Sequence, residues 1–151
     1  PDYAFCPVPG IIPETQFPAG GVTVIAEIMR NEQWPSAHAK VQMYRQLDGV
    51  EYIFCLKTSP AMDSWPYELY DVGNNNPVYP DGAEQHSFDI NETDVPVNDQ
   101  HLVRFDSRRD LGLPQGALLP ADVPDEIAID LVALAKRARL MARLRGEHVA
   151  A

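Results

Sequence analysis

Residues 40–57 read KVQMYRQLDGVEYIFCLK, and the dipeptide Asp48-Gly49 lies near their centre. This dipeptide is typical of the two-residue type I′ turn that closes a β-hairpin. Apolar and polar residues alternate on both sides of it, which is the pattern of half-buried strands. Pairing Leu47 with Val50 gathers the apolar side chains of both strands on one face. The stretch therefore predicts an antiparallel hairpin.

Other short apolar segments surround this hairpin and are separated by residues typical of turns. Of the 14 prolines of the chain, all but Pro96 lie between these segments, as expected for a β protein with many turns. Short strands at such intervals are typical of a mainly β fold, an antiparallel β-sandwich or curled sheet. The strand candidates are Val22–Met29, Tyr67–Val72, Ser87–Ile90, Asp94–Val97 and His101–Asp106.

The 151 residues are expected to form a single domain. Residues 1–21 contain five prolines and three glycines and predict a proline-rich, extended N-terminal arm. Residues 22–106 would form the β-rich domain, residues 107–124 a connector, and residues 125–146 one C-terminal amphipathic helix.

The predicted helix has recognisable ends. Asp122 is the expected N-cap, with Pro124 in the first turn, and Gly146 is the expected terminator. Acidic residues gather at its start and basic residues at its end, which matches the helix macrodipole.

Projected at 100° per residue, the helix carries two apolar strips. Two strips indicate two apolar contacts, because an ordinary surface helix shows one. The helix either is clasped on both sides by its own chain, docks onto a partner, or lies on a membrane surface. One strip holds Ile127, Leu131, Leu134, Ala138 and Met141, the other holds Ile129, Ala133, Leu140 and Leu144, and Lys136, Arg139 and Arg143 lie between them.

Charge is distributed unevenly along the chain. No basic residue lies between Lys57 and Arg104, and the net charge of the chain is −10. Like charges repel, so this interval has to spread out in solvent, meet a cation or face a basic partner. We expect an acidic face formed by Asp81, Glu84, Asp89, Glu92, Asp94 and Asp99.

Common enzyme motifs are missing from the sequence: G-x-G-x-x-G, Walker A, G-x-S-x-G, H-E-x-x-H and C-x-x-C. Cys6 and Cys55 are too few for a disulfide framework, so we expect buried free thiols, with a single bridge as the alternative. We predict no catalytic residue, bound metal or cofactor.

Three weaker constellations remain as alternatives. His86 and His101 lie in or beside the acidic tract and could bind a transition metal. A looser calcium site would use Asp89, Asn91, Asp94 and Asp99, although the spacing fails as an EF-hand. Asp63 and Glu68 beside Trp65, Tyr67 and Tyr70 have the composition of a sugar-binding cleft.

These patterns favour a non-enzymatic subunit of a larger complex, such as a virion or another multi-copy particle. Its arm and helix would dock onto another protein or a second copy, rather than nucleic acid or a membrane. The helix would use Ile129, Ala133, Leu140, Leu144, Lys136, Arg139 and Arg143. Two alternatives are an acidic neutralising protein (an immunity protein, antitoxin or nucleic-acid mimic) that covers a basic partner site, and a small metal- or carbohydrate-binding module.

No segment approaches the roughly 20 apolar residues of a membrane span, and the chain starts without the features of a signal peptide. We therefore expect a cytoplasmic protein, or part of a particle assembled in the cytoplasm.

Overall fold

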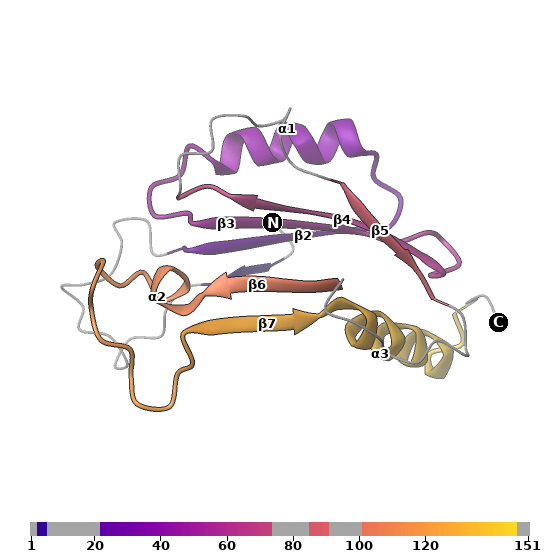
Figure 1. The fold of residues 1–151 in the computed structure, drawn as a ribbon. Helices are drawn as coiled ribbons and strands as arrows, with labels where there is room; N and C mark the ends of the chain where they lie inside the picture. Colours follow the sequence, from indigo (N-terminus) through magenta and orange to yellow (C-terminus); the bar gives the residue numbers. More distant parts are fainter. Residues whose placement is uncertain (1–2, 6–21, 74–84, 91–100, 148–151) are drawn as a thin grey trace.

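The computed structural model describes residues 3–5, 22–73, 85–90 and 101–147, and these form three layers (Figure 1). A helix covers one face of a five-stranded sheet, while a two-stranded sheet and a second long helix lie beyond the other face. The larger sheet contains β1 (Tyr3–Phe5), β2 (Val24–Met29), β3 (Tyr52–Lys57), β4 (Ser64–Asp71) and β5 (His86–Asp89), in that order.

The predicted hairpin around Asp48-Gly49 is wrong. Residues Trp34–Tyr44 form helix α1, which connects β2 to β3 in parallel register. Ala37 and Val41 are four residues apart and both fully buried. This spacing places them on one face of a helix, and their burial against the sheet outweighs the apolar–polar alternation that suggested a strand. Gly49, with φ of 88°, belongs to the loop that leaves the helix.

The remaining pairs of the larger sheet are antiparallel: β1 with β2, β3 with β4, and β4 with β5. The sheet is therefore mixed, with one parallel pair at its centre. Of the predicted arm, Tyr3–Phe5 forms the edge strand β1; most of the rest lies outside the described residues, as does the strand candidate Asp94–Val97.

The second sheet pairs β6 (Leu102–Asp106) with β7 (Glu126–Asp130), and short helix α2 (Ser107–Asp110) follows β6. The prediction of a helix from residue 125 is wrong over its first turn and a half, because residues Glu126–Asp130 pair with β6. Helix α3 (Leu131–Leu144) begins after them.

Capping explains where α3 begins and ends. The side chain of Asp130, not Asp122, accepts a hydrogen bond from the backbone N–H of Ala133 at 3.0 Å, as an N-cap residue does. Gly146 has φ of 75°, so the predicted terminator is confirmed.

Two hydrophobic cores fill the spaces between the layers. One contains Ile25, Ile53 and Tyr70 and lies under α1. The other contains aromatic side chains of β3, β4 and β5 and packs against β6, β7 and α3; within it the rings of Tyr52 and Phe105 meet edge to face at 5.2 Å.

The fold is mainly β with a C-terminal helix, as the sequence predicted, and it has two sheets. The prediction of an antiparallel arrangement is wrong for one pair, because β2 and β3 run parallel. The sandwich arrangement stays a prediction. In the described segments, α1 and α3 are both too short and too polar to cross a membrane.

Candidate functional site

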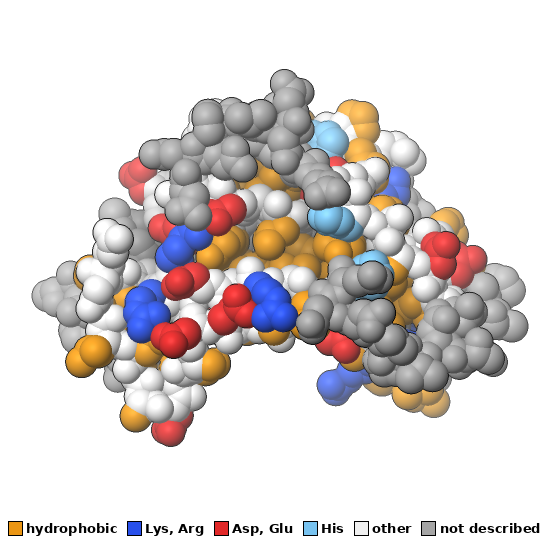
Figure 2. Space-filling model, in the orientation of Figure 1, with side chains coloured by type: hydrophobic (Ala, Val, Ile, Leu, Met, Phe, Trp, Pro, Cys, Tyr) orange, Lys and Arg blue, Asp and Glu red, His pale blue; other side chains and the backbone are white. Residues whose placement is uncertain are grey.

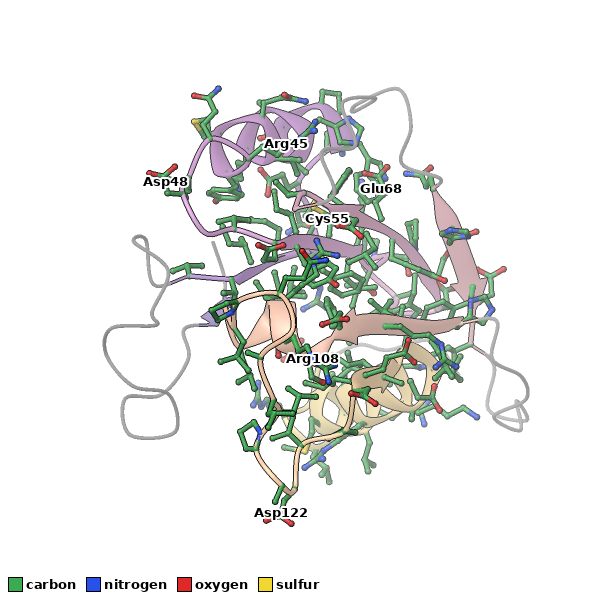
Figure 3. The ribbon with its side chains drawn as sticks, turned by 60° about the vertical axis from the view of Figure 1, so that its left-hand side comes forward. Arg45, Asp48, Cys55, Glu68, Arg108 and Asp122 are labelled. Atoms are coloured by element: carbon green, nitrogen blue, oxygen red, sulfur yellow. The ribbon has the colours of Figure 1, made fainter. Side chains whose placement is uncertain are left out.

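A row of polar side chains crosses the larger sheet beneath α1. Glu27 on β2 is the register partner of Cys55 on β3, and Cys55 is the partner of Glu68 on β4. Their exposed fractions are 2%, 0% and 4%. Figure 3 shows Cys55 and Glu68 on the strands under α1, on the opposite side of the sheet from Arg108. Carboxylates are rarely buried unless they are paired, so this row needs a physical explanation.

Helix α1 provides the partners of Glu27. Lys40 donates from Nζ to Oε2 of Glu27 at 3.0 Å, and Tyr44 donates from its hydroxyl to Oε1 at 2.6 Å. Lys40 and Tyr44 are four residues apart, so they lie on the same helix face. Lys40 also donates to Oε2 of Glu32 at 3.0 Å, and Glu32 lies just before the helix. One ammonium group is thus held between two carboxylates.

This arrangement fixes the charges of the cluster. Burial raises the pKa of Glu27, but the hydrogen bonds from Tyr44 and Lys40 are among the effects that outweigh it, and the net shift is downward. The pKa of Lys40 is raised above its usual range, chiefly by its hydrogen bond to Glu27 and then by that to Glu32. Glu27 and Lys40 therefore both carry their charge at neutral pH.

The cluster is reachable from solvent on one side. The side chains of Lys40 and Glu32 are 34% and 28% exposed, whereas that of Glu27 is 2% exposed. A ligand entering from solvent would meet Lys40 and Glu32 first, with the ionised Glu27 behind them.

A second group of polar side chains surrounds Glu68, at the other end of the row. His38 of α1 places Nε2 at 3.0 Å from Oε2 of Glu68, and Gln85 donates to Oε1 at 3.2 Å. The hydroxyl of Tyr70 donates to the same carboxylate. These three contacts satisfy the buried carboxylate and tie α1 to β4.

Cys55, between the two carboxylates, is a free thiol. Burial, and then the negative charges of Glu68 and Glu27, raise its pKa to about 12. The thiolate is the nucleophilic form of cysteine, so Cys55 is not a nucleophile at neutral pH. The row of Glu27, Cys55 and Glu68 is therefore suited to electrostatic interactions with a ligand and not to covalent catalysis by the thiol.

The residues predicted for partner docking are separated by the structure. Arg139 is buried, with 4% exposure, and donates from Nη1 to the backbone carbonyl of Ile90 at 2.7 Å. Including it in an exposed docking surface was wrong. The side that packs against the protein carries Leu131, which belongs to the first predicted strip, together with Ala135, Arg139 and Ala142. Ile129 belongs to β7 and is 40% exposed; Ala133, Leu140, Arg143 and Leu144 are exposed and Lys136 is half-buried on α3.

Of the predicted acidic face, Asp89 is described and is exposed at the end of β5. Asp81, Glu84, Glu92, Asp94 and Asp99 lie outside the described residues, as does Asn91 of the calcium alternative. The acidic face therefore stays a prediction.

The histidine and sugar constellations have a structural explanation. His86 and His101 both pack against Tyr67, with ring centroids 5.2 and 6.3 Å away. Trp65 and Tyr67 are buried in the core beside β6, whereas Glu68 and Tyr70 face α1. The proposed sugar-binding group is thus divided between two faces of the sheet. Across the described segments, no three His, Cys, Asp or Glu side chains gather at metal-binding distance.

Sequence reasoning missed the Glu27–Lys40 cluster because it placed Lys40 on a strand. One signal was present: Glu27 is the one charged residue in the apolar strand VIAEIM. A helix between that strand and the next would have placed Lys40 and Tyr44 on one face.

Comparisons of the chain with protein-family models, with curated proteins and with solved structures find no match.

Proposed function

We propose that the protein hydrolyses phosphate esters with the help of a divalent cation, at the cluster formed by Glu27, Glu32 and Lys40. The supporting observation is that one lysine ammonium lies 3.0 Å from a carboxylate oxygen of each glutamate. The sequence favoured a non-enzymatic protein; the buried and charged cluster is what leads us to an enzyme. Groups with shifted pKa values that meet in one place mark candidate active sites.

The donor set suits a magnesium or manganese ion. Oε2 of Glu27 and Oε2 of Glu32 converge on a position that a cationic group already occupies. Magnesium is usually bound by one or two carboxylates, with water and substrate phosphate oxygens completing its shell. Two carboxylates in the described residues are therefore sufficient for such a site.

Tyr44 and Lys40 would then have separate roles in the reaction. A bound cation supplies a polarised phosphoryl oxygen and a water of lowered pKa. Tyr44 holds the carboxylate of Glu27 in one orientation through its 2.6 Å hydrogen bond. Lys40 would place its positive charge against the phosphate. The oxygen of the attacking water would bond to phosphorus as the ester P–O bond breaks; the water would lose a proton to solvent, and the leaving alkoxide would take up a proton from solvent.

Other reaction classes fit the cluster less well. Acyl transfer needs an activated nucleophile, and the high pKa of Cys55 excludes the buried thiol from that role. General base catalysis works best with a group whose pKa is near neutral, whereas the pKa values of Glu27 and Lys40 are shifted away from neutrality. The role that the charged cluster fits best is therefore electrostatic stabilisation of an anionic substrate.

The proposal is tested with four substrates, each with magnesium, manganese or a chelator. The substrates are p-nitrophenyl phosphate, bis(p-nitrophenyl) phosphate, single-stranded DNA and duplex DNA. We expect cation-dependent hydrolysis of at least one of them and a loss of roughly 100-fold in Glu27→Gln. Asp48→Asn, an exposed acid outside the cluster, is the matched control. No hydrolysis of any substrate by the folded wild type would overturn the proposal.

A second candidate function is self-association through the outer side of α3. Leu134, Leu140, Met141 and Leu144 are 43%, 57%, 44% and 73% exposed, opposite the side that packs against the protein. Large exposed apolar patches mark interaction sites. A second copy is the occupant that the charges favour, because basic residues flank this side while the chain as a whole carries −10.

Light scattering across a concentration series tests this second candidate. We expect the wild type to form dimers or larger species, and Leu140→Glu with Leu144→Glu to remain monomeric. The exposed leucine Leu118, 91% exposed on the connector, provides the control substitution Leu118→Glu. A monomeric wild type at high concentration would exclude this candidate and leave the enzymatic proposal unaffected.

A further inference from the structure

A cavity of about 220 Å³ lies between the two sheets, on the side of the larger sheet away from α1. Its walls are almost entirely apolar. Figure 2 shows hydrophobic side chains gathered at the centre of this face, above a band of basic and acidic ones. The apolar lining consists of Val24 and Ala26 of β2, Phe54 of β3, Phe105 of β6, and Ile127 and Ile129 of β7.

One acidic side chain, Asp110, interrupts this lining. Asp110 is 8% exposed, and throughout the described part of the chain its carboxyl group makes no hydrogen bond or ion pair. Burial raises its pKa, with no other cause acting on it. An ionised carboxylate in apolar surroundings without a partner is costly, so a cationic partner would stabilise the ionised form of Asp110 at this wall.

The backbone around Asp110 holds the group in place. The hydroxyl of Thr23 donates to the backbone carbonyl of Asp110 at 2.5 Å, and Thr23 is fully buried. Asp106 caps α2 by accepting hydrogen bonds from the N–H groups of Arg108 and Arg109. The acid is therefore fixed relative to β2 and β6, which is the condition for a preformed site.

We propose that this cavity binds a small cationic amphiphile: one aromatic ring or a short aliphatic chain that ends in a primary ammonium group. The apolar part would occupy the space between Phe54, Phe105 and Ile127. The ammonium group would supply the charge and the hydrogen bonds that the carboxyl group of Asp110 lacks.

Size and charge both restrict the ligand. An engineered apolar cavity of about 150 Å³ holds benzene, so about 220 Å³ accommodates a single ring with a short side chain. A neutral hydrocarbon would leave the carboxyl group unsatisfied, and an anion would be repelled. An amine satisfies both the apolar wall and the acid.

Benzylamine, benzyl alcohol and toluene separate these contributions, because they share a ring and differ in the polar group. Binding is measured on the full chain by calorimetry and by chemical-shift changes of the cavity residues. We expect saturable 1:1 binding of benzylamine, at least tenfold tighter than that of benzyl alcohol. Asp110→Asn should remove this preference while binding of toluene stays within twofold.

Two further variants make the result interpretable. Ala26→Leu fills the cavity from β2 and should abolish binding of all three probes. Asp89→Asn, an exposed acid at the end of β5, should leave binding unchanged. The proposal is overturned if benzylamine does not bind the folded wild type, or if Asp110→Asn binds it with equal affinity.

Discussion

Lys40 of α1 and Glu27 of β2 form an ion pair in which Nζ lies 3.0 Å from Oε2, and Glu27 is buried while Lys40 is one-third exposed. The pair links α1 to β2 within the β2–α1–β3 unit, beside the apolar core that lies under the helix. It also leaves a charged group at the edge of the solvent, which is where a ligand would meet it. The same contact therefore links α1 to the sheet and positions the charges that the proposed reaction uses.

Arg109 is expected to stabilise the junction between α2 and the larger sheet. It donates from Nε to Glu51 at 2.9 Å and from Nη1 to Asp71 at 3.0 Å, with its guanidinium 4.4 Å from the ring centroid of Tyr52. Arg109→Ala should lower the free energy of unfolding by about 1–2 kcal/mol, since the pairs are partly exposed. Urea denaturation measures the change.

Arg104→Ala is the matched control for that substitution. Arg104 pairs with Glu126 on the exposed side of the β6–β7 sheet, where an ion pair contributes about 0–1 kcal/mol. An equal loss of stability in both variants would contradict the role assigned to Arg109.

Asp110 is expected to destabilise the fold at neutral pH. Its pKa is raised from 3.8 by burial, so the folded state binds the proton more tightly than the unfolded state does. Stability contributed by the protonated form is complete below pH 3.8 and is lost as the pH rises through the higher folded value. Asp110→Asn should therefore be more stable than the wild type at pH 7, with the difference shrinking toward pH 4.

Urea denaturation of both proteins at pH 4 and pH 7 measures this difference. Asp89→Asn serves as the control at each pH. A wild type that gains stability relative to Asp110→Asn between pH 4 and pH 7 would show that the sign is wrong.

Cys55 is expected to be chemically inert in the folded protein. It is fully buried, and its pKa is raised to about 12, chiefly by burial. Iodoacetamide at pH 8 should leave Cys55 unmodified in the native protein and label it after denaturation, because the thiolate is the reactive form. Peptide mass spectrometry reads the labelling at Cys55 alone. Rapid labelling of the native protein would mean that the space between the carboxylates is open.

Arg139 is expected to hold α3 against the end of β5. Its guanidinium donates to the carbonyl of Ile90 at 2.7 Å in a buried position. Arg139→Met should lower the free energy of unfolding by about 1–3 kcal/mol, because the buried carbonyl loses a charged donor. Arg137→Met, on the exposed side of the same helix, should change it by less than about 0.5 kcal/mol. Thermal unfolding distinguishes the two variants.

The sequence predicted most strands because their apolar runs are bounded by turn residues. β2, β4, β5 and β6 all lie within one to three residues of the predicted segments. The strand after Asp48-Gly49 was also predicted, from the alternation beside the turn, although β3 is buried on both faces. For these strands the local pattern of apolar and polar residues is sufficient, because it follows which side chains are buried.

Two elements were assigned the wrong type for a shared reason. Val41 and Ile127 each fit a period of two as well as a period near 3.6, so the pattern alone could not decide. Packing over the sheet determines that residues 34–44 form helix α1. Pairing with β6, between residues 20 to 28 positions apart, determines that β7 is a strand. Such tertiary contacts outweigh local preference.

The candidate site depended on the element that was misread. Lys40 and Tyr44 meet Glu27 because a helix carries them over the sheet. The position of Asp110 in the cavity could not be predicted from the sequence either, because its neighbours there come from four strands. Neither group could be assembled from sequence without the topology.

The phosphodiesterase role of Lys40 is tested by the rate of bis(p-nitrophenyl) phosphate hydrolysis with and without manganese, in wild type and Lys40→Met. Lys40→Met keeps the aliphatic part of the side chain, and Lys136→Met on α3 is the matched control. We expect manganese-dependent hydrolysis by the wild type and the control, and a rate at least tenfold lower in folded Lys40→Met. Equal rates in the wild type and Lys40→Met, or no hydrolysis by the wild type, would contradict it.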